Sequence, residues 1–147
     1  MDYVEHGSRR AGPMPVQGFS MLAGLLFLVL GAAGLIPGVT VDGVAAGGQP
    51  ASLLFGLFAV SAVHNLVHLL SGVVAVFCAG SARRSRMFLL VAGLLYLAFC
   101  LFGLFVPDSM STLLPMNNAD NWLNLGLGTA MLVAYASTTG RTSPPVE

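Results

Sequence analysis

Four long apolar runs, none containing a charged residue, dominate this chain and limit what it can fold into. They are Phe19–Ile36, Leu53–Gly80, Met87–Val106 and Trp122–Thr138. A bilayer core about 30 Å thick is crossed by roughly 20 apolar helical residues, so each run is a candidate membrane span. Helices are the expected spanning form, because lipid offers the backbone no hydrogen-bonding partner. The sequence therefore predicts an all-α fold, an integral membrane four-helix bundle.

The positions of the arginines predict how the bundle is oriented. The chain has no Lys, and its arginines lie outside the four runs, at Arg9, Arg10, Arg83, Arg84, Arg86 and Arg141. With four spans, all of these arginines fall on one face of the membrane, which the positive-inside rule makes cytoplasmic. We expect residues 1–17 and 139–147 to be cytoplasmic tails of a membrane domain at 18–138. The connections Pro37–Pro50 and Pro107–Asn121 should face outward from the inner (plasma) membrane.

Composition supports membrane location and narrows the classes of partner. Hydrophobic residues make up 56% of the chain and charged residues 8%, which is outside the range of soluble globular proteins. The formal net charge of zero argues against a nucleic-acid partner. Cys78 and Cys100 are expected at different depths, so we expect packing roles for them and no disulfide.

The chain contains an internal repeat. The residues Phe27, Leu28, Gly31 and Gly34 recur as Tyr96, Leu97, Cys100 and Gly103, and the segment 64–72 recurs as 120–128 with its Asn and Gly at the same offsets. Both halves run across the membrane and back in the same sense. We therefore expect two parallel-related two-helix repeats around a pseudo-twofold axis along the membrane normal.

Polar residues gather at one predicted depth in both halves. His64 and His68 are four residues apart and share one helix face, with Asn65 beside them. Counting outward from Gly80 places His64 about 6 Å below the outer boundary. The repeat places the second group at the same level, and its members are Asp120, Asn121 and Asn124. The segment 51–59 is then surplus to the span, so helix 2 either continues above the membrane or is strongly tilted.

Three interpretations of this polar cluster remain open. The first is structural, with hydrogen bonds across helices that fix the packing of the bundle. The second is a metal or haem site, in which His64 and His68 bind a divalent ion with Asp120 as a third ligand. Haem held by two histidines on facing helices is not available, because the other spans contain none. The third is a proton or small-molecule pathway, which lacks the usual intramembrane acid.

Small residues recur every four positions along two of the runs. Such stripes allow close approach of helix backbones, either within the bundle or against a partner. The helix-packing positions expected from this pattern are Gly126, Ala130 and Ala134 in the fourth run and Ser71, Ala75 and Ala79 in the second.

Three segments of the chain resemble a known family. They are residues 27–40, with the pattern Phe-Leu-Val-Leu-Gly and then Ile-Pro-Gly-Val-Thr, residues 64–69 and residues 118–123. On these segments the chain resembles the four-span bacterial membrane family of domain of unknown function 4383. The resemblance implies a fold and a membrane location but no activity. In the family, the position of Asn124 is usually His, so this departure favours the structural interpretation of the cluster.

No nucleophile–base arrangement or phosphate-binding loop occurs in the sequence, so we expect no enzymatic activity. The expected role is an accessory or scaffolding subunit that packs against other membrane-protein subunits in the lipid bilayer, without a cofactor. The alternative is a membrane protein that binds a metal ion, haem or a pigment through His64 and His68.

Overall fold

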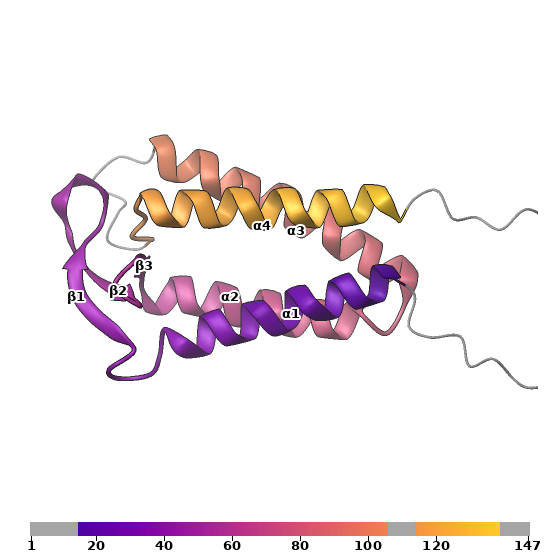
Figure 1. Ribbon diagram of the computed structural model, residues 1–147, viewed down its shortest axis with the longest axis horizontal. Helices are drawn as coiled ribbons and strands as arrows, with labels where there is room; N and C mark the ends of the chain where they lie inside the picture. Colours follow the sequence, from indigo (N-terminus) through magenta and orange to yellow (C-terminus); the bar gives the residue numbers. More distant parts are fainter. Residues whose placement is uncertain (1–14, 106–113, 139–147) are drawn as a thin grey trace, which may run out of the picture.

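The computed structural model describes residues 15–105 and 114–138 of the chain, and in them four helices lie side by side (Figure 1). The helices are α1 (Pro15–Ala33), α2 (Ala62–Cys78), α3 (Ala82–Phe105) and α4 (Asn118–Ser137). Between α1 and α2 the chain forms β1 (Thr40–Val44), the short 3-10 helix η1 (Ala46–Gly48), β2 (Pro50–Leu54) and β3 (Phe58–Val60). The sheet caps one end of the helices, and the α2–α3 turn lies at the opposite end (Figure 1).

Equivalent residues begin the second helix of each half. Ser61 precedes α2, and its side-chain oxygen accepts a hydrogen bond of 3.1 Å from the backbone N–H of His64. Asn117 precedes α4, and its side-chain oxygen accepts a hydrogen bond of 3.0 Å from the backbone N–H of Asp120. Both side chains satisfy helix N–H groups that have no intrahelical partner. Ser61 and Asn117 are separated by the same number of residues as the repeated segments 64–72 and 120–128, so the two caps are equivalent under the repeat.

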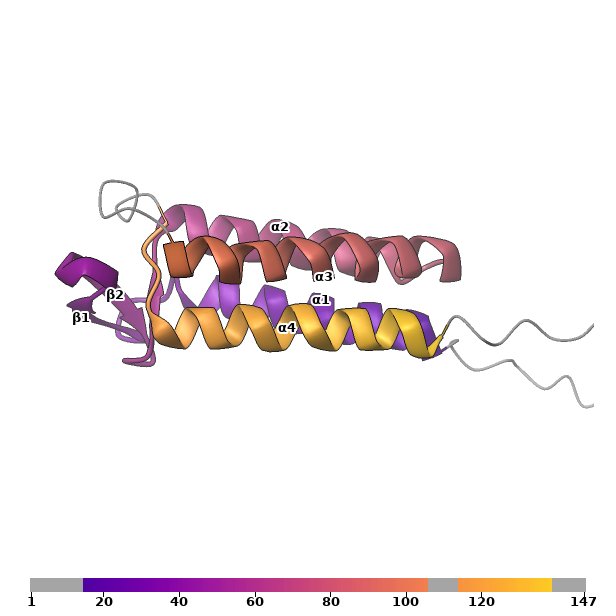
Figure 2. The same ribbon diagram turned by 90° about the horizontal axis from the view of Figure 1, so that it is seen from above.

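The helices associate in two pairs, α1 with α2 and α3 with α4 (Figures 1 and 2). A Cβ added at Gly72 would lie 2.7 Å from Cγ of Leu28, and one added at Gly128 would lie 2.9 Å from Cγ of Leu97. These two contacts are equivalent under the repeat. Backbones come this close only where a side chain is absent, so the same small residues set the spacing of both pairs.

The two pairs meet around Phe27 and Tyr96, which are repeat equivalents. Their side chains are 0% and 1% exposed, and their rings stack with centroids 4.7 Å apart. Leu89 on α3 and Ala75 on α2 are buried in the same core. Repeat-equivalent aromatic rings therefore meet where the two helix pairs pack together.

The all-α prediction is wrong for the segment between α1 and α2. Strands β1, β2 and β3 form an antiparallel sheet in that order, with Asp42 opposite Ser52 and Leu53 opposite Ala59. The β2–β3 turn uses left-handed backbone conformations at Phe55 (φ 53°) and Gly56 (φ 72°). Glycine adopts such a conformation without strain, which makes Gly56 the sequence signal for a turn at this point.

The same finding corrects the predicted second span. Helix α2 begins at Ala62, whereas the apolar run begins at Leu53, so residues 51–59 neither prolong the helix nor require it to tilt. A short apolar run without periodicity is compatible with a buried strand as well as a helix. Ser61 is the residue at which the run changes from strand to helix, because its side chain caps α2.

Two of the described helices are long and apolar enough to cross a membrane, Val16–Ala33 in α1 and Ala82–Phe105 in α3. Helix α2 is apolar but has only 17 residues. The described arginines, Arg83, Arg84 and Arg86, lie at the start of α3, at the end of the molecule away from the sheet (Figure 1). The predicted tails, apart from residues 15–17, and residues 107–113 of the predicted outer connection at 107–121 lie outside the described residues.

The small-residue stripes are only partly buried. Ala75, Ala79 and Ala134 are buried, and Ser71 is half-buried. Gly126 and Ala130 are exposed, and a Cβ added at Gly126 would meet no atom within 4 Å. Within this chain the close approach on α4 is made by Gly128, and a packing role for Gly126 stays a prediction that concerns contact with a partner. The repeat, rather than the four-residue spacing, identifies the packing glycine.

Candidate functional site

The six polar residues singled out from the sequence are all buried at the sheet end of the helices. Their exposed fractions run from 1% to 8%, for His64, Asn65, His68, Asp120, Asn121 and Asn124. Buried polar groups are normally paired, because an unpaired donor or acceptor loses its hydrogen bonds to water. The partners of each side chain therefore indicate whether it has a packing role or is available for a ligand.

Asp120 joins α4 to the sheet. One of its carboxylate oxygens, Oδ2, accepts hydrogen bonds from the backbone N–H of Asn117 (2.9 Å) and of Ala59 in β3 (3.0 Å). The Asn117 amide also donates to the backbone carbonyl of Leu57, at 2.7 Å. Asn117 and Asp120 form a capping box, with a carboxylate at the positive end of the helix dipole. The Oδ2 atom of Asp120 is thus used for structure.

Asp120 precedes the predicted fourth span, and two influences act on its carboxyl group. Burial raises the pKa of Asp120 to about 6, because the charged form loses its contact with water, whereas the hydrogen bonds from Asn117 and Ala59 lower it. Its second oxygen, Oδ1, is buried without a hydrogen-bond partner among the described residues. A proton on this carboxyl group would therefore remove an unfavourable buried charge.

His64 occupies in α2 the position that Asp120 occupies in α4. Its ring stacks on that of His68, with centroids 4.7 Å apart and an interplanar angle of 8°. The Nδ1–H of His68 donates to the backbone carbonyl of His64 at 3.2 Å, which leaves Nε2 of His68 as an acceptor. In the described part of the chain, neither that Nε2 nor Nδ1 of His64 has a hydrogen-bond partner. With Oδ1 of Asp120 and Oδ1 of Asn121, these nitrogens are the buried side-chain atoms of the cluster that have no partner there.

In each helix pair, one asparagine of the repeat packs against a glycine. Asn65 donates to the backbone carbonyl of Gly34 at 2.9 Å, and a Cβ at Gly34 would overlap the Asn65 side chain. Asn121 also lies against a glycine, because a Cβ at Gly103 would overlap its Oδ1 atom, but this oxygen has no hydrogen-bond partner among the described residues. The two contacts are equivalent under the repeat. Both asparagine side chains therefore pack within their own helix pair and are not directed at the imidazoles.

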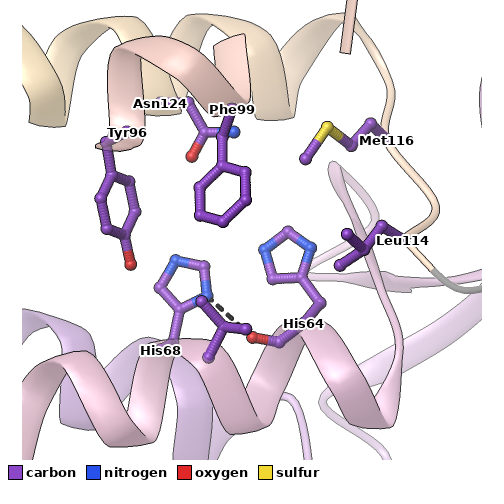
Figure 3. A pocket seen from close by; sticks show the side chains of 8 residues that line it. His64, His68, Tyr96, Phe99, Leu114, Met116 and Asn124 are labelled. Atoms are coloured by element: carbon purple, nitrogen blue, oxygen red, sulfur yellow. Dashed lines mark hydrogen bonds between the residues drawn. The ribbon is translucent and has the colours of Figure 1, made fainter. Parts of the chain in front are cut away.

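Two small cavities lie on either side of the histidine pair. The first, of about 10 Å³, is lined by both imidazoles and by side chains of α3 and α4, and Figure 3 shows Tyr96, Phe99 and Asn124 around the two rings. The second, also about 10 Å³, is lined by the two histidines, Asn65 and Asp120. Each has room for about one water molecule. The structure thus brings Asn124 and Asp120 near the histidines, but on different sides of them.

Among residues 15–105 and 114–138, no hydrogen bond directly joins a side chain of the 64–68 segment to one of the 120–124 segment. The structural interpretation predicted hydrogen bonds across the helices, and between these two segments the cavities have room only for water-bridged ones. Over the same residues, no group of three or more His, Cys, Asp and Glu side chains could hold a metal ion. The predicted metal ligands His64, His68 and Asp120 are not gathered as such a group.

Sequence reasoning missed three contributors to this region. Tyr96 and Met116 line the first cavity, and Ala59 supplies a hydrogen bond to Asp120. Tyr96 appeared only as the repeat equivalent of Phe27, although a phenol at an otherwise apolar position was a usable signal. Ala59 donates through its backbone, so no side-chain pattern could have identified it.

Comparison with known proteins gives a family and no nearer relative. No curated protein matches the chain, and no solved structure matches it. The family described as Domain of unknown function (DUF4383) matches residues 17–137, which include α1, apart from its first two residues, and the polar residues of both halves. The match extends over most of the chain, and the chain therefore belongs to the DUF4383 family.

Proposed function

We propose that this chain is a multi-pass membrane protein that has no catalytic activity and serves as an accessory or scaffolding subunit of a larger membrane complex. The observation that supports membrane insertion is the distribution of side chains. Large apolar residues are exposed on every helix, for example Leu22 (66%), Val73 (58%), Val91 (57%) and Val133 (61%). The histidines and Asn65 of α2, and Asp120, Asn121 and Asn124 of α4, are buried. Lipid favours this arrangement and water opposes it.

We propose that all four helices cross the plasma membrane of a bacterial cell, with both termini in the cytoplasm. Arg83, Arg84 and Arg86 lie at one end of the molecule, and the sheet, with Asp42, lies at the other. Helix α2 spans about 26 Å at 1.5 Å per residue, which is close to the thickness of a bilayer core. The sheet then lies at the outer surface, where the sequence placed His64 and Asp120.

Cysteine labelling tests this topology. Asp42 and Gly80 are both exposed, one at each end of the molecule. In a chain lacking its native cysteines, a membrane-impermeant thiol reagent should label Asp42→Cys in intact cells and Gly80→Cys only after lysis. Labelling of Gly80→Cys from outside would contradict the four-span arrangement. Carbonate extraction of the same membranes checks insertion independently.

A packing role for the polar cluster supports the accessory function. Asp120 and Asn65 spend their hydrogen bonds on backbone groups of neighbouring elements, which fixes the sheet and the helix pairs in place. The cavities at the cluster hold about one water each. A protein whose polar groups are used in this way is suited to presenting a fixed apolar surface to other subunits.

Purification from native membranes in mild detergent tests the accessory role. A subunit should elute in a complex larger than the 15.2 kDa chain, with partner proteins in fixed stoichiometry. Substitution of exposed apolar residues one at a time, for example Val133→Trp, should find at least one position that releases the chain and leaves its own fold intact. Elution of the wild-type chain alone, from gently solubilised membranes, would contradict the proposal.

One observation favours a second function, the binding of a metal ion, haem or a pigment. Nδ1 of His64 and Nε2 of His68 are buried without a hydrogen-bond partner among the described residues, and imidazole nitrogens are common metal ligands. The small cavities favour an ion over a large planar cofactor. Metal analysis and an absorption spectrum of the protein from native membranes distinguish the two functions. A stoichiometric metal or a Soret band that is lost in His68→Gln would support binding.

A further inference from the structure

A groove lies between α2 and α3, lined by neither histidine, and has a volume of about 650 Å³. Its walls are apolar, with Leu70 and Val74 on α2 and Met87, Val91 and Leu95 on α3. Ser71, Phe88 and Ala92 also line it. The volume is within the range of small-molecule sites, roughly 300–1,000 Å³. The groove thus offers an elongated apolar ligand a place along the two helices.

Arg83 and Arg84 line one end of this groove, and both side chains are exposed. They lie in the first turn of α3, where the helix dipole is itself positive and no acidic residue is present. Neither α2 nor α3 contains an Asp or Glu, so these helices supply no carboxylate to pair with the guanidinium groups. The Arg84 guanidinium lies over the Phe77 ring, 4.7 Å from its centroid. The groove therefore joins a cationic end to an apolar wall.

Arg86 differs from its two neighbours. It donates a hydrogen bond of 2.8 Å to the backbone carbonyl of Thr138 and stacks over Tyr135 at 5.0 Å. This arginine holds the start of α3 to the end of α4 and does not line the groove. Replacing Arg86 would remove the same charge, from the same end of α3, as replacing Arg83 or Arg84. It would also remove the hydrogen bond to Thr138.

We propose that the groove binds one acyl chain of an anionic phospholipid, with the lipid phosphate held by Arg83 and Arg84. The inference rests on the proposed membrane insertion, because the groove then faces the leaflet on the arginine side. Basic groups between membrane helices at this level meet phosphates, whereas the walls deeper in the groove meet only hydrocarbon. A soluble anion would leave the apolar wall empty, and an apolar peptide would leave both arginines unpaired. An anionic lipid satisfies both parts of the site.

Lipid titration of the full chain in mild detergent tests this site. Binding of phosphatidylglycerol is measured by native mass spectrometry and by the rise in unfolding temperature, beside phosphatidylcholine with the same acyl chains and glycerol phosphate without chains. Phosphatidylglycerol should bind preferentially and raise the unfolding temperature, and the two comparison compounds should not. Arg83→Gln and Arg84→Gln should each weaken binding about fivefold, since a basic residue near an anionic surface contributes on the order of that factor.

A matched pair on α2 tests the apolar wall. Val74 lines the groove and is 49% exposed, whereas the adjacent Val73 does not line it and is 58% exposed. Val74→Trp should fill the groove and abolish preferential binding, and Val73→Trp should leave it unchanged. Equal binding of both lipids, or full phosphatidylglycerol binding by Val74→Trp, would overturn the proposal. Carbonate extraction of the same cells reports membrane insertion, so failure of lipid selectivity is distinguishable from failure of the proposed topology.

Discussion

The rings of Phe27 and Tyr96 stack 4.7 Å apart at the centre of the molecule, and each is the other's equivalent in the internal repeat. His68 packs against both, with ring centroids 5.7 Å from Phe27 and 5.8 Å from Tyr96. The histidine pair therefore rests directly on the contact that joins the two halves. A change at either ring should affect both the packing of the halves and the geometry of the candidate site.

Tyr96→Ala should lower the free energy of unfolding by about 3–5 kcal/mol, because it leaves a large cavity beneath Phe27 and His68. Tyr96→Phe should have a much smaller effect, since the phenol makes only a long 3.4 Å contact with Oγ of Ser71. Denaturant titration in detergent measures both. If Tyr96→Phe were as damaging as Tyr96→Ala, the hydroxyl would have a stronger partner than Ser71.

Gly103→Ala should lower the free energy of unfolding by about 1–3 kcal/mol through overpacking. The added methyl group would overlap Oδ1 of Asn121 and lie 2.8 Å from the sulfur of Met116. The repeat predicts a similar loss for Gly34→Ala, which would displace the side chain of Asn65. Unfolding titrations in detergent measure the loss of free energy of unfolding in both variants.

Gly126→Ala is the matched control on α4, because an added Cβ there meets nothing within 4 Å. It should leave the monomer unchanged or stabilise it by roughly 0.5–1 kcal/mol, since alanine favours the helix. A large loss of complex formation without loss of monomer stability would place Gly126 at a subunit interface. If Gly103→Ala proved as harmless as Gly126→Ala, the close packing of Asn121 against Gly103 would not contribute to stability.

The helices and the repeat could be predicted from the sequence because their signals are local. Uncharged runs mark the helices, and matching Asn and Gly residues mark the two halves. The equivalent positions of His64 and Asp120 were also predictable, and the structure places both in the first turn of their helices. These features depend on spacing along one segment, which a single sequence displays directly.

The sheet and the partners of the site could not be predicted in the same way. Leu54 and Phe58 pair across the hairpin, but a continuous apolar run has the same residue pattern whether it is helical or paired in strands, and only Gly56 indicates the turn. The bond from Ala59 to Asp120 joins residues 61 positions apart through a backbone donor. Such contacts follow from how the elements pack, and they leave no pattern in the residue types.

Asp120 should make stability depend on pH in a particular sense. Its pKa is raised by burial to about 6 from 3.8, so between these values the folded chain binds more protons at this site than the unfolded chain. The free energy of unfolding should therefore fall as pH rises from about 4 to about 6 and then level off. Asp120→Asn should remove this contribution, and unfolding titrations across the range compare the two. An unchanged profile in Asp120→Asn would assign the dependence to another group.

His64→Leu and Asn65→Leu should have opposite consequences, although the two residues are neighbours and equally buried. The Asn65 amide donates to the Gly34 carbonyl at 2.9 Å, so its replacement removes a hydrogen bond, crowds a glycine and should cost about 1–3 kcal/mol. Nδ1 of His64 has no partner in the described chain, so a leucine of similar volume removes an unsatisfied buried nitrogen. His64→Leu should therefore keep or raise the free energy of unfolding measured in detergent.

The comparison also separates the two proposed functions of the histidines. In a scaffolding protein, His64→Leu should retain both its stability and its partners. In a metal-binding protein, the same substitution should keep the apo chain folded but abolish bound metal and the stabilisation that metal provides. Unfolding titrations with and without a chelator, beside metal analysis, record both quantities. His64→Leu could instead lose as much stability as Asn65→Leu in a protein without bound metal. That result would show that the imidazole has a hydrogen-bonding partner. It would contradict both the scaffolding and the metal-binding interpretation, because each leaves Nδ1 of His64 without a protein partner.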